Sequence, residues 1–385
     1  MASTANAPEL TVKIDGSTSI ETDTGDALET RGGRGLLSVT VDLRLDSPDM
    51  FSVEYDMMKY EKLNLIDAFK PGAQVEIGMG LESHELLCVG EISYIEPNFD
   101  PAAGYRTIIS GYHKLHRLTR GQRSRTWGEG LDPDVASTDA VRNVIGDSGA
   151  QKGGGSDSLS ADSIGSGKVK HAYIPQLNSS DFELLTALGM ELEYKSDSVE
   201  SNKVKFTQPD VGQSPVLSLA RERAGEGGDA KLMMSVNFRM STVQQYSRVE
   251  VRSWDPWKKK NIVGVSESSN YSFSGTKGWE ATGKALYNSN SVGRTYVVTD
   301  QPVDSQDEAD NLAQSIFDQY SMDFITGEAV VQGNPEVTPG KTVEFNGFGG
   351  TFSGVYLITS ATHTYRSDDG YRTTISFARN AHQGS

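Results

Sequence analysis

Two short blocks of sequence occur twice in the chain, and this repetition constrains the fold more than any other feature. Residues 71–77 (PGAQVEI) return as residues 339–345 (PGKTVEF). A GYRT block begins 33 residues after the first proline, at Gly104, and 31 residues after the second, at Gly370. Pro-Gly favours a tight turn into the following strand, and GYRT opens a return strand. The alternative is chance repetition of common hairpin residues; we interpret the blocks as a duplicated barrel.

Most of the remaining sequence has the period of two that a half-buried β-strand requires. Apolar and polar residues alternate over 37–45, and the pattern recurs over 75–81 and 355–361. Helical signals are few. Ser180 and Ser305 each begin a capping box, and apolar residues recur at helical spacing behind them. The expected fold is mainly β with minor α: two tube-like β-barrel domains related by internal duplication, plus an inserted α+β region.

These patterns divide the chain into three parts. The expected parts are a first tube-like β-barrel at 8–120, an inserted α+β domain at 121–235, and a second tube-like β-barrel at 236–385 with a helix at about 305–321. Within the insert, residues 147–167 are rich in Gly, Ser and Ala, which predicts a flexible loop. A weaker match aligns residues 51–55 with 247–251 as a further piece of the duplication.

Net charge and cysteine content exclude several classes of protein. The formal net charge of −16 argues against a nucleic-acid binder that neutralises phosphates. Cys88 is the single cysteine, so an internal disulfide or a thiolate zinc site is excluded. No apolar run approaches the roughly 18 residues that span a bilayer, and the N-terminus lacks the features of a signal peptide. We expect folding in the cytoplasm and no direct membrane insertion.

One segment has the opposite charge from the rest of the chain. Residues 106–125 contain six cations and no acid: Arg106, Lys114, Arg117, Arg120, Arg123 and Arg125. We call this segment the basic strip. It is either a solvated strand face or a docking strip for an acidic surface on another copy or a partner. Nucleic acid is a third and weaker interpretation, because Tyr112 alone does not make an interleaved set of aromatic stacking platforms.

No catalytic or metal-binding constellation stands out among the titratable residues. The six histidines form no His-Glu-x-x-His pattern, and on a strand His113 and His116 would point to opposite faces. His363 lies in an alternating stretch and is interpreted as structural. The Gly-rich residues 31–35 lack the lysine and helix of a phosphate loop. We therefore expect no enzyme activity, no cofactor and no metal.

Several blocks in order along the chain resemble the phage late control D family, which is similar to the hub part of VgrG. The blocks are residues 111–127 (GYHKLHRLTRGQRSRTW), 180–185 (SDFELL), 249–256 (VEVRSWDP), 333–340 (GNPEVTPG) and 352–356 (FSGVY) followed by GYRT at 370–373. The resemblance extends from about residue 36 to 379. One departure is His113, where the family pattern commonly has an acid.

The resemblance implies a structural hub of a contractile injection machine or phage-tail baseplate. Such hubs are homotrimers that act as symmetry adaptors between a hexameric tail tube and a trimeric spike. Since the sequence ends at Ser385, we expect a separate spike protein, with baseplate wedge proteins as further partners. After cytoplasmic assembly the hub would be part of a contractile particle. The residues expected to bind tube, spike or a second copy are Pro71, Gly72, Val75, Arg117, Arg120, Arg123, Arg125, Pro339, Gly340 and Val343.

A β-rich tail adhesin or carbohydrate-binding protein is the alternative. Trp254, Trp257 and Trp279 could serve as sugar platforms if they are exposed. Packing at barrel ends and subunit contacts is the other interpretation of these three residues, and it is the one we favour.

Overall fold

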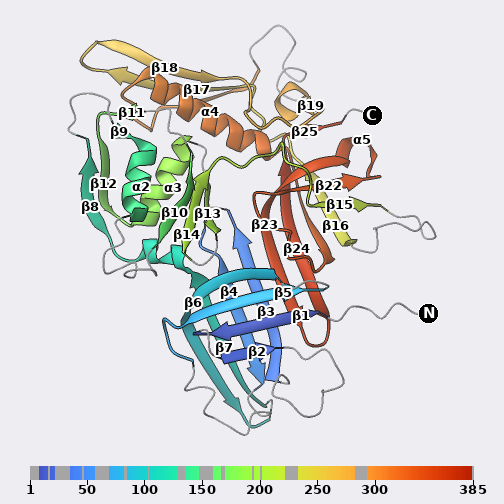
Figure 1. Cartoon of the computed structure of the whole chain (residues 1–385). Coiled ribbons are helices and arrows are strands. Elements are labelled where there is room, and N and C mark those ends of the chain that lie inside the picture. Colours follow the sequence, from blue (N-terminus) through green and yellow to red (C-terminus); the bar gives the residue numbers. More distant parts are fainter. Residues whose placement is uncertain are drawn as a thin grey trace.

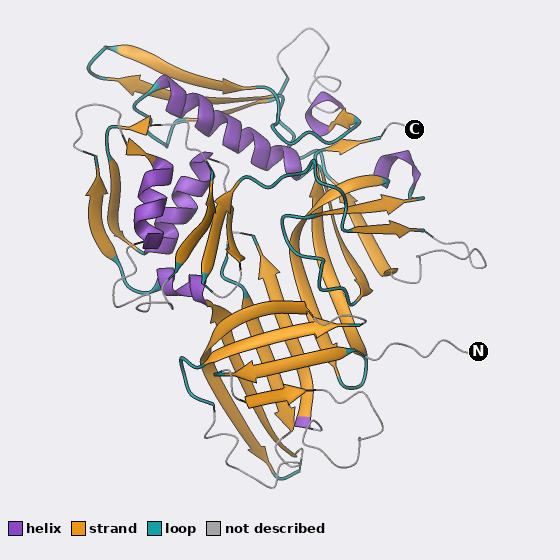
Figure 2. Cartoon of the chain, in the orientation of Figure 1, coloured by secondary structure: helices purple, strands orange, loops and turns teal. Residues whose placement is uncertain are grey.

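One large β-sheet, built from strands of the N-terminal and C-terminal parts of the chain, forms the centre of the fold (Figure 1). The computed structural model describes residues 8–15, 18–21, 35–45, 47–56, 69–81, 85–102, 104–128, 135–146, 159–165, 170–192, 195–199, 202–221, 233–281 and 293–383. The expected fold class, mainly β with minor α, is confirmed (Figure 2). No helix in these ranges has the length and apolar character needed to cross a bilayer.

The front part of the large sheet has the strand order β3-β4-β7-β6-β5-β1-β2; we call it the front module. Its strands are β1 (Glu9–Ile14), β2 (Thr18–Glu21), β3 (Leu36–Arg44), β4 (Met50–Asp56), β5 (Gln74–Gly80), β6 (Glu85–Asp100) and β7 (Gly104–His113). Alternation works as expected in β3, where Val39 and Val41 are fully buried and the residues between them are not. The Phe51 ring covers Gly90 and Gly111, where a Cβ would clash with it.

The back part of the sheet, the back module, repeats part of this strand order. Its elements are β15 (Leu217–Ala220), β16 (Met233–Met240), β21 (Ile325–Gln332), β22 (Thr342–Asn346), α5 (Gly349–Phe352), β23 (Gly354–Arg366) and β24 (Gly370–Arg379). β23 pairs with β3, so one continuous sheet of thirteen strands joins the modules. Tyr371 of the back module is buried in the front module's core. That each module closes into a barrel stays a prediction.

The insert packs two helices against short strands. Its elements are the 3₁₀ helix η3 (Lys114–Thr119), β8 (Arg123–Trp127), β9 (Val135–Ala136), α2 (Ser137–Gly146), β10 (Ser160–Ile164), β11 (Lys170–His171), β12 (Ile174–Ser179), α3 (Asp181–Leu192), β13 (Lys195–Val199) and β14 (Lys203–Thr207). The loop predicted at 147–167 lies largely outside the described residues. Its described part contains β10, which pairs with β14 and is therefore a strand, not a loop.

A fourth unit lies across the top of Figure 1 and was not separated by the sequence analysis. It comprises β17 (Arg248–Asp255), β18 (Lys260–Ser266), β20 (Thr295–Val298) and α4 (Gln306–Met322), with β19 (Thr276–Lys277) pairing with β25 (Ala381–His382) nearby. The match of 51–55 to 247–251 is wrong, because β17 belongs to this small sheet. The counterpart of β4 is β21, which pairs with β24 as β4 pairs with β7.

Both capping boxes are confirmed at helix starts. Glu183 N–H donates to Ser180 Oγ at 3.1 Å, and Glu183 Oε2 accepts from Ser180 N–H at 2.6 Å. At α4, Glu308 N–H donates to Ser305 Oγ at 3.2 Å. These bonds satisfy N–H groups that have no partner inside the helix, and so fix where α3 and α4 begin.

Candidate functional site

The two Pro-Gly turns make the same hydrogen bonds. Gly72 N–H donates to Ile92 O at 2.8 Å, and Gly340 N–H donates to Ile358 O at 2.9 Å. The return bonds also match, from Ile92 N–H to Ala73 O and from Ile358 N–H to Lys341 O. Both glycines have positive φ, 86° and 81°. That conformation costs other residues free energy, which explains the glycine in each block.

The hairpins behind the turns also share an irregularity. The β6·β7 register shifts between Ile92 and Tyr94, and the β23·β24 register shifts between Ile358 and Ser360. Beyond the shift, Asp100 pairs with Gly104 in the front module, and Arg366 pairs with Gly370 in the back module. A bulge at the same place in two hairpins is a specific feature rather than common hairpin geometry.

Val75 and Val343 are fully buried, in the cores of the front and back modules respectively. Their side chains hold β5 and β22 in place and do not reach the surface of the single chain. Pro71 and Gly72 are exposed, whereas in the turn before β22 Pro339 is buried and Gly340 is partly buried. In the single chain, the first turn is therefore open to a partner and the second is largely covered.

Within the basic strip, Arg117 is buried beside Glu91. Its Nε donates to Glu91 Oε2 at 3.2 Å, and its Nη2 forms a second ion-pair contact with Oε1. Buried Lys114 donates through Nζ to Gln74 Oε1 at 3.0 Å. A buried charge must be hydrogen-bonded and is best paired with an opposite charge; Arg117 is paired with Glu91, and Lys114 is hydrogen-bonded to Gln74, both within the chain.

Two further arginines of the strip join β8 to the start of α3. Arg125 Nε donates to Gln176 Oε1 at 2.7 Å, and its Nη2 contacts the buried carboxylate of Asp181. Arg123 Nε lies 3.9 Å from the same carboxylate. Arg120 differs, because half of its side chain is exposed while its Nη2 lies 3.6 Å from Glu91. Arg120 is therefore the residue of Arg117, Arg120, Arg123 and Arg125 with the most exposed side chain.

His113 and His116 do not lie on one strand as expected. His113 ends β7, and its Nδ1 accepts from Leu115 N–H at the start of η3. His116 Nδ1–H donates to His113 O at 2.9 Å, which leaves Nε2 to accept from Arg120 Nη2 at 2.6 Å. Burial lowers the pKa of His116, and the positive Arg120 lowers it further, in agreement with a neutral ring.

His363 is fully buried, and both of its ring nitrogens are hydrogen-bonded. Nε2–H donates to Val337 O at 3.0 Å, so Nδ1 accepts from the Tyr371 hydroxyl at 2.8 Å. Burial lowers the pKa of His363 to about 4. These contacts agree with the interpretation of His363 as a structural residue.

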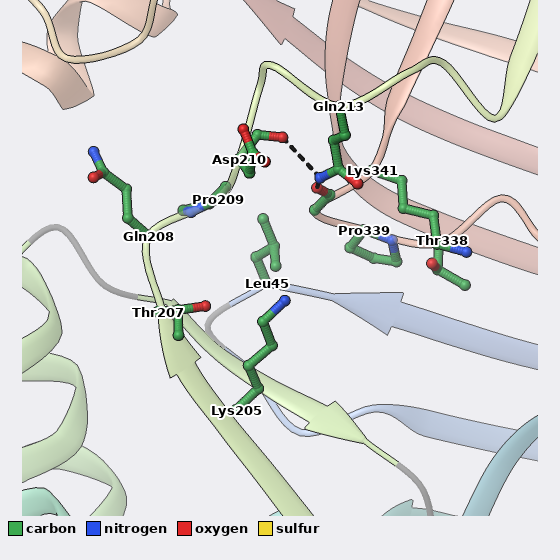
Figure 3. A pocket seen from close by; sticks show the side chains of 11 residues that line it. Leu45, Lys205, Thr207, Gln208, Pro209, Asp210, Gln213, Thr338, Pro339 and Lys341 are labelled. Atoms are coloured by element: carbon green, nitrogen blue, oxygen red, sulfur yellow. Dashed lines mark hydrogen bonds between the residues drawn. The ribbon is translucent and has the colours of Figure 1, made fainter. Parts of the chain in front are cut away.

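A hollow of about 200 Å³ lies where three parts of the chain meet (Figure 3). Leu45 comes from the end of β3, Lys205 and Asp210 from the insert, and Pro339 from the turn before β22. Gln213 Nε2 donates to Asp210 O at 2.7 Å and Gly340 O at 3.0 Å, which ties the insert to that turn. The hollow holds no pair of a nucleophile and a base.

Ser137, His171 and Glu308 have the connectivity of a catalytic triad. Ser137 Oγ lies 2.8 Å from His171 Nε2, and His171 Nδ1 lies 3.6 Å from Glu308 Oε1. Ser137 is fully buried at the start of α2, so a substrate could not reach its hydroxyl. The contacts hold the insert against α4. Over the described ranges, no group of three or more His, Cys, Asp or Glu is placed to hold a metal ion.

The three tryptophans considered as sugar platforms differ in exposure. Trp279 is buried against Phe317 in the α4 unit, so it is not a sugar platform. Trp254 and Trp257 are exposed at the end of the β17–β18 hairpin, and Trp257 is 92% exposed.

Two strand edges were not predicted from the sequence. Residues 94–100 of β6 and the whole of β16 each have a strand on one side only among the described residues. Pro97 and Pro101 are the sequence signal that could have revealed the first edge, because proline within a β-strand is largely confined to edges.

Three comparisons with known proteins gave different kinds of result. The family described as the Alg8 N-terminal domain matches residues 59–367. No curated protein matches the sequence. A tail protein from Neisseria meningitidis has a TM-score of 0.67 at 11% identity, over 97% of each chain. The 43 kDa tail protein of prophage MuSo2 from Shewanella oneidensis has a TM-score of 0.66 at 14% identity, over 97% of this chain and 99% of that one.

A third solved structure comes from a secretion system. It is an Escherichia coli component of the type VI secretion system, described as structurally similar to the T4 tail proteins gp27 and gp5. Its TM-score is 0.53 at 10% identity, over 95% of this chain and 76% of that one. At these identities the likeness establishes a shared fold, the fold of phage tail proteins.

Proposed function

This chain belongs to the family of the Alg8 N-terminal domain, and we propose that it is the structural hub of a contractile injection machine or phage-tail baseplate. In this role it is a homotrimer and a symmetry adaptor between a hexameric inner tube and a trimeric spike. The observation that carries the proposal is the repeated strand register of the front and back modules. Three chains with two similar modules each present six similar units around one axis.

The fold supports the same role. Solved proteins that share it are named as phage tail proteins and as a type VI secretion component. We assign the ring to the barrels expected at 8–120 and 236–385, and place the insert at 121–235 toward the spike or baseplate wedge proteins. The turns at Pro71-Gly72 and Pro339-Gly340 are proposed contacts with the tube. No nucleic acid, cofactor or catalytic step takes part, and assembly occurs in the cytoplasm before incorporation into the particle.

The test is the mass of the purified full-length chain, alone and with candidate tube and spike subunits from the same genome. Sedimentation equilibrium should give three chains per particle, and the tube subunit should co-sediment with that trimer. A monomer that binds neither the tube nor the spike subunit, but binds a glycan array through Trp254 and Trp257, would support the adhesin instead.

A further inference from the structure

The two modules are joined by one strand pair. Ser360–Arg366 of β23 run antiparallel to Ser38–Arg44 of β3, with Thr362 opposite Asp42 and His363 opposite Val41. Backbone bonds from Leu45 N–H to Thr359 O and from Ser367 N–H to Leu37 O lie at the two ends of the ladder. A back-module hairpin strand thus pairs with the first strand of a front module.

Each member of this pair has a counterpart in the other module. The shared bulge and hairpin register make residues 94–100 of β6 the counterpart of 360–366. β16 is the counterpart of β3, since both shift register at the same place, between Leu36 and Ser38 and between Met233 and Ser235. Residues 235–241 therefore correspond to 38–44. Within the described part of the chain, these two counterparts are not paired with one another.

Apolar side chains on the two counterparts are more exposed than those at the same places on the paired strands. Ile95 and Phe99 of β6 correspond to Ala361 and Tyr365, and Phe99 is 53% exposed whereas Tyr365 is half-buried. β16 shows the same difference. Met240 is 37% exposed whereas its counterpart Leu43 is 5% exposed. Exposed apolar side chains along an open strand edge mark a surface that another strand covers.

We propose that residues 94–100 of one copy pair antiparallel with residues 235–241 of a second copy, with Glu96 opposite Arg239 and Asn98 opposite Asn237. The contact has the register of the internal β23·β3 pair. This proposal rests on the self-association of the chain in the proposed function. It assigns the strands, the register and the charged residues of the contact between copies. Each chain supplies one edge of each kind, so the contact is heterologous, and in the proposed trimer three such contacts close a ring.

The charges along the two edges are complementary. In the internal pair, Thr362 Oγ1 donates to Asp42 Oδ1 at 2.9 Å across the ladder. The corresponding residues between copies are Glu96 and Arg239, which are both exposed and have no ion-pair partner within the described ranges. Opposite charges directly across a ladder stabilise it, whereas like charges destabilise it.

Prolines limit which strands the β6 edge accepts. Pro97 corresponds to His363. Leu45 and Thr359 are a backbone-bonded pair, and bonded pairs alternate with non-bonded pairs along an antiparallel ladder, so the N–H and C=O of His363 also face the partner strand. Pro97 and Pro101 cannot donate, so the ladder lacks two of its N–H bonds. Proline protects an edge against indiscriminate pairing. Specific side-chain contacts such as Glu96 to Arg239 must then select the partner.

Disulfide trapping in the full-length chain tests the register. Asn98 and Asn237 occupy a pair without direct backbone bonds, where Cα atoms are about 4.5 Å apart, within disulfide range. Differently tagged Asn98→Cys and Asn237→Cys chains, co-expressed and mildly oxidised, should form a covalent heterodimer. Asn98→Cys with Arg239→Cys, shifted by two residues, should not. The native Cys88 is buried and serves as the background in both.

Charge reversal provides an independent readout of the same contact. Glu96→Arg and Arg239→Glu should each raise the dissociation constant of the trimer about tenfold at low salt. The double variant should return it to near the wild-type value. Glu9→Arg, at an exposed position on β1, is the matched control and should have no effect.

The outcomes separate this contact from the hub role. A trimer that forms without the heterodimer, or that cross-links equally in the shifted pair, overturns the proposed register while the hub proposal stands. A chain that stays monomeric while soluble and folded overturns both.

Discussion

Ile92 and Ile358 occupy the same place in two hairpins: each carbonyl accepts the N–H of a Pro-Gly turn glycine, and the strand bulges directly after it. The turn and the bulge are two constraints on one strand, so together they fix the register of the hairpin. Because side chains alternate with a period of two, a slip of one residue would move the core face of β6 or β23 to the surface.

The first prediction concerns these turns. Gly340→Val should destabilise the fold by about 1–2 kcal/mol or more, because a β-branched residue is strained at a φ of 81°. Gly72→Val, at 86°, should cost about the same, since a Cβ there meets no nearby atom and strain alone acts. Urea denaturation of the purified chain measures both.

Asn is the control at each turn, because it tolerates positive φ better than other residues with side chains. Gly340→Asn should be milder than Gly340→Val. If the valine variant unfolds at the wild-type midpoint and still assembles, the turn does not set the register.

The repeated strand register could be predicted from the sequence where turn residues determine it, and not where packing does. The glycines of the Pro-Gly and GYRT blocks recur because their positive φ requires glycine. β4 and β21 share no such requirement: Phe51 fills the space over two glycines, while its counterpart in β21 is Gly327, covered by Phe377. Because a large residue in one strand corresponds to glycine in the other, β4 and β21 cannot be aligned by sequence. Residues 51–55 of β4 were therefore matched with residues 247–251 instead.

A second prediction follows from the ion pair of Glu91 and Arg117. Both side chains are more than nine-tenths buried. Arg117→Met should lower the free energy of unfolding by about 3–5 kcal/mol, because it leaves Glu91 charged and buried with only the more distant Arg120. Thermal unfolding measures the loss.

The double variant Glu91→Gln with Arg117→Met is the control for that prediction. It removes both charges, so it should recover a large part of the lost stability. A double variant less stable than Arg117→Met alone would mean that Glu91 is stabilised by other contacts.

A third prediction concerns pH and His363. The folded chain holds its pKa at about 4, below the ordinary value of about 6.5, so the unfolded chain binds the proton more readily. The free energy of unfolding that His363 contributes is therefore fully present above about pH 6.5. It declines by about 3 kcal/mol as the pH falls toward 4. Urea midpoints between pH 7 and 4 measure it.

His363→Gln separates this effect from carboxylates that titrate in the same range. The variant should be less stable at pH 7, because it loses bonds to Val337 and Tyr371, yet its stability should fall less steeply with acid. Equal slopes for wild type and variant would contradict a neutral, buried His363.

The basic strip shows what sequence reasoning could not supply. Six cations without an acid in 106–125 are evident from the sequence, but their partners lie elsewhere in the chain. Glu91 is on the preceding strand, and Asp181 follows β12. Only the folded arrangement reveals that Arg117 and Arg125 are used inside the chain and that Arg120 is the more exposed one.

The last prediction separates internal from external roles within the strip. Arg125→Gln should destabilise the insert by roughly 3 kcal/mol, because Asp181 is buried and would keep only the longer contact to Arg123 and its hydrogen bonds. Arg120→Gln should cost under about 1 kcal/mol, since its side chain is half exposed.

If the strip docks on an acidic surface, Arg120→Gln weakens trimer or partner binding at low salt and has less effect at high salt, because screening removes the attraction. Arg142→Gln, an exposed arginine paired with Asp139 on α2, is the matched control. Wild-type binding by Arg120→Gln at low salt would mean that Arg120 is simply solvated.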